Sequence, residues 1–174
     1  MPAWPRSVDP YVLDRARGVR CLILDIDGVV TDGKLYHGPD GGEWKTSNVR
    51  DGLGIRRMSD AGLHVAVISG RPSPPMEERL RKLGVKQLFM NTSDKMPAFE
   101  SLLENLALTP AQCAMMGDDT PDLPLMRRCA LGLTVADAHP QVRHCADWVS
   151  EFTGGHGAVR EACDLLLDAQ DRDA

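Results

Sequence analysis

Six short apolar runs, four of which end in polar clusters, constrain the fold of this chain more than any other feature. Amphipathic, helix-like stretches lie between these runs. Apolar strands that alternate with such helices are typical of a parallel sheet covered on both faces. We therefore predict an α/β fold with a doubly wound, Rossmann-like parallel sheet. The predicted strands are residues 21–24, 63–68, 85–90, 113–116, 131–135 and 148–149, and the predicted helices are residues 52–61, 74–83, 96–106, 122–129 and 158–169.

One segment, residues 31–45, breaks this alternation directly after the first strand. It carries Gly38-Pro39-Asp40-Gly41-Gly42 between Tyr36 and Trp44. Turn residues between short apolar stretches predict a β-hairpin that projects from the sheet. The whole length of 174 residues suits one domain. We predict a single domain over residues 1–174, with a short N-terminal extension (1–18) and a C-terminal tail (154–174).

Composition excludes several classes of function. The net charge of −5 argues against a nucleic-acid partner. No apolar run approaches the ~18 residues of a spanning helix, so we expect no membrane role. The N-terminus carries Pro2, Pro5 and Pro10 without the apolar segment of a secretory signal. The five cysteines form no Cys-x-x-Cys pair and are typical of reduced thiols, so we predict a cytoplasmic location.

Two carboxylates, Asp25 and Asp27, follow the first predicted strand. Neighbouring carboxylates repel each other unless a cation or a proton lies between them. Mg²⁺ suits such a pair because it prefers carboxylate, water and phosphate oxygens, and Asp118 and Asp119 after another strand could complete the ligand set. The alternative is that Asp25 and Asp27 only form a turn before Gly28.

Further polar groups follow two other strands. Ser69 offers a hydroxyl, Gly70 an accessible backbone N–H, and Lys95 a positive charge, all suited to a phosphoryl group. Lys95 on its own could equally be a solvated surface lysine. Ligands in α/β sheets bind beyond the carboxyl ends of the strands, and these groups converge there with the carboxylates. The combined pattern predicts a phosphoryl-transfer site.

This ordered set resembles the haloacid dehalogenase superfamily over residues 20–170. The resemblance implies that Asp25 is the nucleophile, which forms an aspartyl phosphate, and that Asp27 is the general acid and base. It implies that Ser69 and Lys95 hold the phosphate. It also implies Mg²⁺ as cofactor, bound by the Asp25 carboxylate, the Asp27 backbone carbonyl and Asp118. An acid at position 27 favours phosphatases within this superfamily.

Longer motifs are similar to the capless sugar-acid phosphatases of this superfamily, which lack a separate cap domain. They include the segment from Asp25 to Gly33, the Asn-Val-Arg-Asp-Gly segment at residues 48–52 and the Gly-rich tail. The pattern best resembles phosphatases of 3-deoxy-D-manno-octulosonate 8-phosphate, which serve lipopolysaccharide biosynthesis. The tail has His156 where those enzymes commonly have Arg, and Ser47 replaces their usual Phe. The resemblance implies these substrate-binding residues: Asn48, Val49, Arg50, Asp51, Gly52, Arg56, Arg71 and Arg79.

The expected partners are a small sugar-acid phosphate and other copies of the chain. A capless site is open, so the hairpin and tail of a neighbouring subunit are expected to close it, and the resemblance implies a homotetramer. Three alternatives remain at this point. They are a phosphatase of nine-carbon, sialic acid-type 9-phosphates, a phosphoacceptor signalling domain and a non-catalytic assembly subunit. Asp25 and Asp27 on the first strand argue against a signalling receiver, whose phosphoacceptor follows a later strand.

Overall fold

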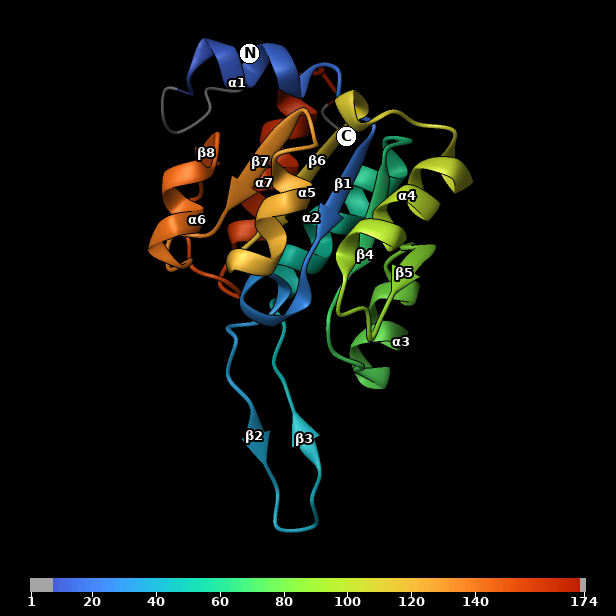
Figure 1. The fold of residues 1–174 in the computed structure, drawn as a ribbon, viewed down its shortest axis with the longest axis vertical. Coiled ribbons are helices and arrows are strands. Elements are labelled where there is room, and N and C mark those ends of the chain that lie inside the picture. The colour runs from blue at the N-terminus through green and yellow to red at the C-terminus, as the bar shows by residue number, and fades with distance from the viewer. Residues whose placement is uncertain (1–7, 173–174) are drawn as a thin grey trace.

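A parallel six-stranded sheet forms the centre of the computed structural model, which describes residues 8–172 (Figure 1). The sheet order is β5-β4-β1-β6-β7-β8, and every neighbouring pair of strands is parallel. The chain moves outward from β1 in one direction and then from β6 in the other, which confirms the predicted doubly wound topology. The strands are β1 (Cys21–Leu24), β4 (His64–Ile68), β5 (Gln87–Phe89), β6 (Cys113–Gly117), β7 (Leu131–Thr134) and β8 (Trp148–Val149).

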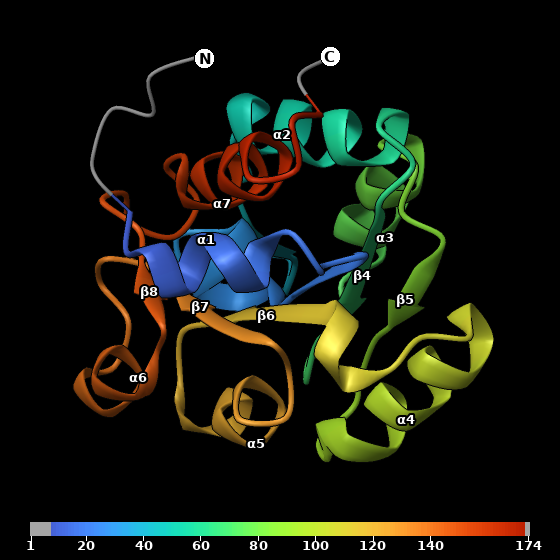
Figure 2. The ribbon, with the colours of Figure 1, turned by 90° about the horizontal axis from the view of Figure 1, so that it is seen from above.

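Helices cover both faces of this sheet (Figure 2). On one face lie α2 (Val49–Asp60), α3 (Pro74–Lys82) and α7 (Ala158–Asp168). On the other lie α4 (Lys95–Leu106), α5 (Leu123–Met126) and α6 (Pro140–Cys145). The central strands β1 and β6 are buried along their whole length, as expected for a sheet with two covered faces.

Two short α-helices of the described residues were not predicted from the sequence. The first, α1 (Pro10–Ala16), lies within the predicted N-terminal extension, whose first seven residues are outside the described part of the chain. Asp9 caps this helix, because its Oδ1 accepts a hydrogen bond from Tyr11 N at 2.8 Å. Val12 and Ala16 are buried, so this helix is part of the core. The second is α6, which begins at a proline.

The predicted hairpin consists of β2 (Tyr36–His37) and β3 (Glu43–Trp44), which pair antiparallel. It projects far from the body of the molecule at the end of the sheet where the strands finish (Figure 1). Tyr36 lies opposite Trp44, and the two residues are 51% and 70% exposed. The described residues 8–172 contain no separate cap domain, as predicted. Within the same range, no helix is both long and apolar enough to cross a membrane.

Candidate active site

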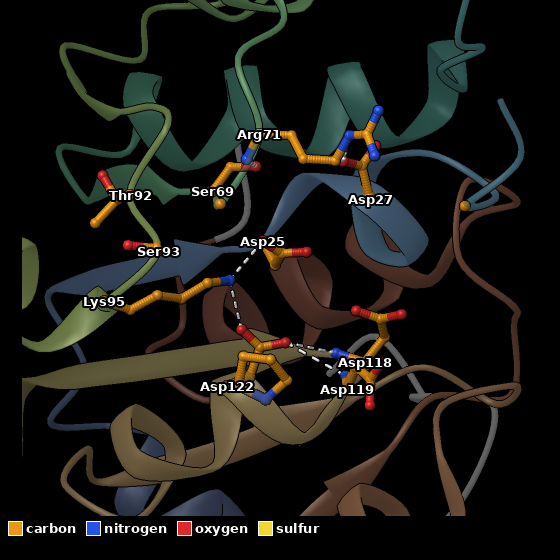
Figure 3. A pocket seen from close by; sticks show the side chains of 13 residues that line it. Asp25, Asp27, Ser69, Arg71, Thr92, Ser93, Lys95, Asp118, Asp119 and Asp122 are labelled. Carbon is orange, nitrogen blue, oxygen red and sulfur yellow. Dashed lines mark hydrogen bonds and ion pairs between the residues drawn. The ribbon is translucent and has the colours of Figure 1, made fainter.

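A cavity of about 420 Å³ lies at the carboxyl edge of the sheet (Figure 3). Its wall comes from the segments that follow β1, β4, β5 and β6, the four strands whose polar clusters were predicted to converge. The topological switch between β1 and β6 opens this space, because the chain leaves these neighbouring strands in different directions. The lining residues are Asp25, Asp27, Gly33, Ser69, Gly70, Arg71, Thr92, Ser93, Lys95, Asp118, Asp119, Pro121 and Asp122.

Lys95 connects two carboxylates at the centre of this cavity. Its Nζ lies 2.6 Å from Asp25 Oδ1 and 2.6 Å from Asp122 Oδ1. Lys95 begins α4 and is only 7% exposed, so it is not a solvated surface lysine. Burial acts to lower the pKa of the Lys95 ammonium, but the two carboxylates outweigh burial and raise that pKa above its usual value. Lys95 is therefore a fixed positive charge in the cavity.

Asp118 and Asp122 form the part of the cavity wall that follows β6. Asp122 Oδ2 accepts hydrogen bonds from Asp118 N at 3.0 Å and from Asp119 N at 3.4 Å, which holds the turn after β6 in place. Gly28, with φ +89°, lets the first turn approach this wall, since a Cβ atom at that position would collide with the Asp118 carboxylate. The turns after β1 and β6 thus meet at close range.

Carboxylate oxygens of Asp25, Asp118 and Asp122 lie within 4.8 Å of one another. Burial and the neighbouring carboxylates Asp25, Asp122 and Asp119 raise the pKa of Asp118 to about 8. Burial raises the pKa of Asp25 to about 6; Lys95 opposes this rise and Asp122 adds to it. Three carboxylates therefore face a single ammonium group, and the excess negative charge fits a divalent cation with oxygen ligands.

Asp122 was missed in the sequence, where it was assigned only to the start of a helix. Asp122 is indeed the N-cap of α5, and it also forms, with Asp118, the two ends of a tight turn that includes the short 3₁₀ helix Thr120–Asp122. The acidic run Gly117-Asp118-Asp119 continues to Asp122 after Thr120-Pro121, and this spacing was the available signal.

Asp27 lies on the other side of the cavity, near Arg71 (Figure 3), and a second cation, Lys45, contacts it from the hairpin segment. Lys45 Nζ is 2.7 Å from Asp27 Oδ1 and 3.0 Å from its Oδ2. Arg71 Nε lies 3.9 Å from Asp27 Oδ2, and Arg71 Nη2 is 2.7 Å from Glu43 Oε2. Sequence reasoning did not single out Lys45 or Glu43, which come from the hairpin segment.

Ser69 lies directly after β4 and is buried. Its backbone bridges two strand ends, since Ser69 N donates to Phe89 O at 2.9 Å and Ser69 O accepts from Thr92 N at 3.0 Å. This link brings Thr92 and Ser93 into the cavity wall with further hydroxyl groups. Hydroxyls and a lysine around one space can donate several hydrogen bonds to a phosphate.

The residues predicted to bind substrate are distributed differently. Arg71 lines the cavity, whereas the other seven are absent from its wall. Asn48 caps α2, with Oδ1 accepting from Arg50 N at 2.9 Å, and Val49 is exposed beside it. Asp51 is buried and accepts hydrogen bonds from Gly157 N at 3.2 Å and Arg160 N at 2.8 Å. It therefore joins α2 to the start of α7.

The remaining predicted arginines also point elsewhere. Arg56 Nη2 donates to Lys82 O at 2.7 Å on the surface. Arg79 lines a separate hollow of about 320 Å³ beside the hairpin base, together with Lys45 and Ser47. Gly52 lies against the Arg79 guanidinium, where a Cβ atom would be only 3.0 Å from Nη2. Exposed His156, in the tail, contacts Gly154 O through Nδ1 at 2.8 Å.

Comparisons with known proteins agree with this geometry. A family of haloacid dehalogenase-like hydrolases matches residues 87–161. The 3-deoxy-D-manno-octulosonate 8-phosphate phosphatase KdsC of Salmonella typhimurium is 48% identical over 94% of this chain and 87% of its own length. The crystal structure of the phosphatase of that name from Yersinia pestis has a TM-score of 0.93 and 45% identity, and the match covers 95% of this chain and 89% of that one.

A second solved structure carries ligands. It is the phosphatase of the same name from Moraxella catarrhalis, in complex with a magnesium ion, a phosphate ion and the sugar acid. Its TM-score is 0.89 at 34% identity, and the match covers 92% of both chains.

Proposed function

The chain belongs to the haloacid dehalogenase-like hydrolases, and we propose that it hydrolyses 3-deoxy-D-manno-octulosonate 8-phosphate to the free sugar acid and phosphate. One observation carries this proposal. Asp25 lies in a cavity that also holds a buried ammonium group and four further carboxylates, on a chain 48% identical to a phosphatase of that substrate. Such a constellation serves phosphoryl transfer, in which charge on the phosphoryl oxygens must be neutralised.

In the proposed mechanism, Asp25 attacks phosphorus and forms an aspartyl phosphate. The P–O bond to the sugar breaks, and the sugar oxygen keeps the electron pair and takes a proton from Asp27. In the second half, Asp27 takes a proton from water as the water oxygen attacks phosphorus, which releases phosphate and regenerates the Asp25 carboxylate. The covalent intermediate splits one slow hydrolysis into two easier steps.

Lys95 and Ser69 are proposed to hold the phosphoryl group. Support comes from the buried position of both residues and from the two ion pairs that fix the Lys95 ammonium. Because these contacts exist before substrate binds, little reorganisation is required during the reaction. Thr92 and Ser93 line the same side of the cavity, and the Thr92 hydroxyl donates to Met90 O at 3.3 Å.

Mg²⁺ is proposed to be held by Asp25, Asp118 and Asp122, with the Asp27 backbone carbonyl as the further ligand that the family implies. When bound, it supplies positive charge to the phosphoryl oxygens and to the Asp25 carboxylate. The three mutually close carboxylates support this assignment, since burial and, to a smaller extent, their mutual repulsion raise the pKa values of Asp25 and Asp118.

Recognition of the sugar acid is proposed to begin at Arg71, whose guanidinium can bind a carboxylate in two places. Contacts to the sugar acid are also proposed for Asn48, Val49, Arg50, Gly52, Arg56 and Arg79. Asp51 is proposed to support this segment by holding α2 against the start of α7. We also propose that the protein is a homotetramer in the cytoplasm, in which neighbouring subunits cover the hairpin. The exposed aromatic side chains of Tyr36 and Trp44 support such a contact.

The test is a comparison of kcat/KM for two substrates, the eight-carbon sugar-acid 8-phosphate and a nine-carbon, sialic acid-type 9-phosphate. Specificity is the ratio of these constants. We expect the eight-carbon substrate to be preferred, and a preference for the nine-carbon substrate would overturn the proposal. Light scattering tests the assembly, because a single 19 kDa species would contradict the tetramer.

A further inference from the structure

Lys45 occupies an unusual position for a residue of a projecting hairpin segment. It directly follows β3, yet its side chain is only 5% exposed. Burial of an ammonium group is costly unless carboxylates compensate its charge. The compensating groups are Asp27, at 2.7 and 3.0 Å, and Glu43, whose Oε1 is 3.8 Å away. A buried lysine therefore contacts both oxygens of the carboxylate assigned to proton transfer.

The Asp27 carboxylate needs external support. Its backbone is fixed in the turn Ile26–Val30, but its side chain reaches into an open cavity and is 23% exposed. A general acid must point at the leaving oxygen, and displacement by about 1 Å can cost about 10²-fold in rate. Lys45 holds the carboxylate from the hairpin side. Arg71 lies at 3.9 Å and is itself paired with Glu43.

We propose that Lys45 is a positioning residue for the general acid Asp27, and that it makes proton delivery to the leaving group depend on the placement of the hairpin. This inference rests on the proposed function. As the proton leaves Asp27 for the sugar oxygen, negative charge develops on a carboxylate that already contacts an ammonium group. Charges in place before the reaction stabilise such a transition state without reorganisation.

The position of the hairpin affects a second ion pair as well as the contact between Lys45 and Asp27. Lys45 and Glu43 both belong to the return strand of the hairpin or directly follow it, and they form a four-residue network with Asp27 and Arg71. A shift of the hairpin base would move Lys45 away from Asp27. The same shift would also separate Glu43 from Arg71, which lines the cavity.

The experiment compares two substrates that differ in their need for a general acid. The leaving group of an alkyl sugar phosphate requires a proton, whereas 4-nitrophenolate departs from 4-nitrophenyl phosphate without one. The full-length protein with Mg²⁺ is used, and kcat/KM is measured because it reports only the phosphorylation half of the reaction. For Lys45→Met, we expect a fall of about 10–10²-fold on the sugar phosphate and less than about threefold on the nitrophenyl ester.

Two variants accompany this measurement. Lys34→Met is the matched control, because Lys34 is an exposed lysine paired with Asp32 at 3.7 Å outside the cavity. It should leave both rates unchanged. Lys45→Arg keeps the positive charge and should recover most of the lost rate on the sugar phosphate. It also provides the test if Lys45→Met fails to fold, since it should still affect the sugar phosphate more than the aryl ester.

Equal losses on the two substrates, or no loss on either, would overturn the inference and assign Lys45 a purely structural role. Equal rates for Lys45→Arg and Lys45→Met on the sugar phosphate would also overturn it, because charge would then be irrelevant. Failure of the proposed function is a different result, in which the wild-type protein itself releases no phosphate from the sugar substrate.

Discussion

The cavity at the carboxyl edge of the sheet and the hairpin beside it are built in opposite ways. In the cavity, Asp25, Lys95 and Asp122 are buried and fixed by short ion pairs. The hairpin has strands of two residues and exposed aromatic side chains, and it projects away from the core. A single chain therefore assembles the groups for phosphoryl transfer, whereas the surface that would select the sugar is left open. We infer that phosphoryl binding and sugar selection are separable in this protein except at the hairpin base, where Lys45 contacts Asp27, and mutations can test that separation.

The largest effect is expected from Asp25→Asn. An amide cannot attack phosphorus as a carboxylate does, so kcat should fall on the order of 10⁴–10⁶-fold on every phosphate ester tested. The fold should survive, because Lys95 keeps its ion pair with Asp122. Phosphate release measures the rate, and the melting temperature is the control. A variant that loses only the sugar substrate would contradict the separation of the two regions.

Removal of Mg²⁺ should abolish phosphate release, and its addition should restore it. The carboxylates must lose their protons to bind the ion, so the affinity for Mg²⁺ should rise as pH rises through about 6 and about 8, the pKa values of Asp25 and Asp118 in the metal-free protein. Binding near pH 7 should therefore release protons. Calorimetry in two buffers of different ionisation enthalpy detects this release, and identical heats in both buffers would refute it.

For sugar selection, Arg71→Ala should raise KM for the sugar-acid phosphate by about 10–100-fold, the usual cost of one lost hydrogen bond to a charged group. Arg81→Ala is the matched control, because Arg81 pairs with Glu77 on the surface at 2.7 Å and does not line the cavity. Its effect should stay within about threefold. Steady-state kinetics on both variants gives the comparison. An Arg81→Ala effect as large as that of Arg71→Ala would contradict the assignment of Arg71 to substrate binding.

The smallest catalytic effect is expected at Asp51, despite its place in the predicted substrate-binding segment. Asp51→Ala should lower the free energy of unfolding by about 1–3 kcal/mol, because it leaves the backbone N–H groups of Gly157 and Arg160 without an acceptor. KM should change little at temperatures where the variant is folded. Urea denaturation and kinetics distinguish the roles, and a raised KM with unchanged stability would assign Asp51 to the substrate.

The same contrast explains how much could be predicted from the sequence. The carboxyl ends of parallel strands lie at the same edge of the sheet, independently of loop conformation. The convergence of Asp25, Ser69, Lys95 and Asp118 therefore followed from the pattern of apolar runs. Asp122 was not predicted as a site residue, because its role depends on a tight turn after β6 that brings it beside Lys95. Its spacing from Asp118 was visible, but the geometry of the turn was not.

Lys45 and α1 were not predicted from the sequence, for other reasons. A lysine after a hairpin strand is usually solvated, and only the folded hairpin base shows that this one is buried against Asp27. For α1, no helix was predicted in the N-terminal extension, although Asp9 followed by Pro10 is a common start of a helix. The capping signal alone did not show that this segment joins the core. The burial of Val12 and Ala16 against the rest of the fold is visible only in the structure.

The central claim is that Asp25 carries the phosphoryl group during hydrolysis of the sugar phosphate, and borohydride trapping tests it most directly. The enzyme is quenched during turnover of 3-deoxy-D-manno-octulosonate 8-phosphate and reduced, which converts an aspartyl phosphate to homoserine at its position in the chain. Peptide mass spectrometry should find homoserine at position 25 and unmodified aspartate at positions 27 and 118. Rapid turnover with no homoserine at position 25, or with the label at another aspartate, would contradict the account.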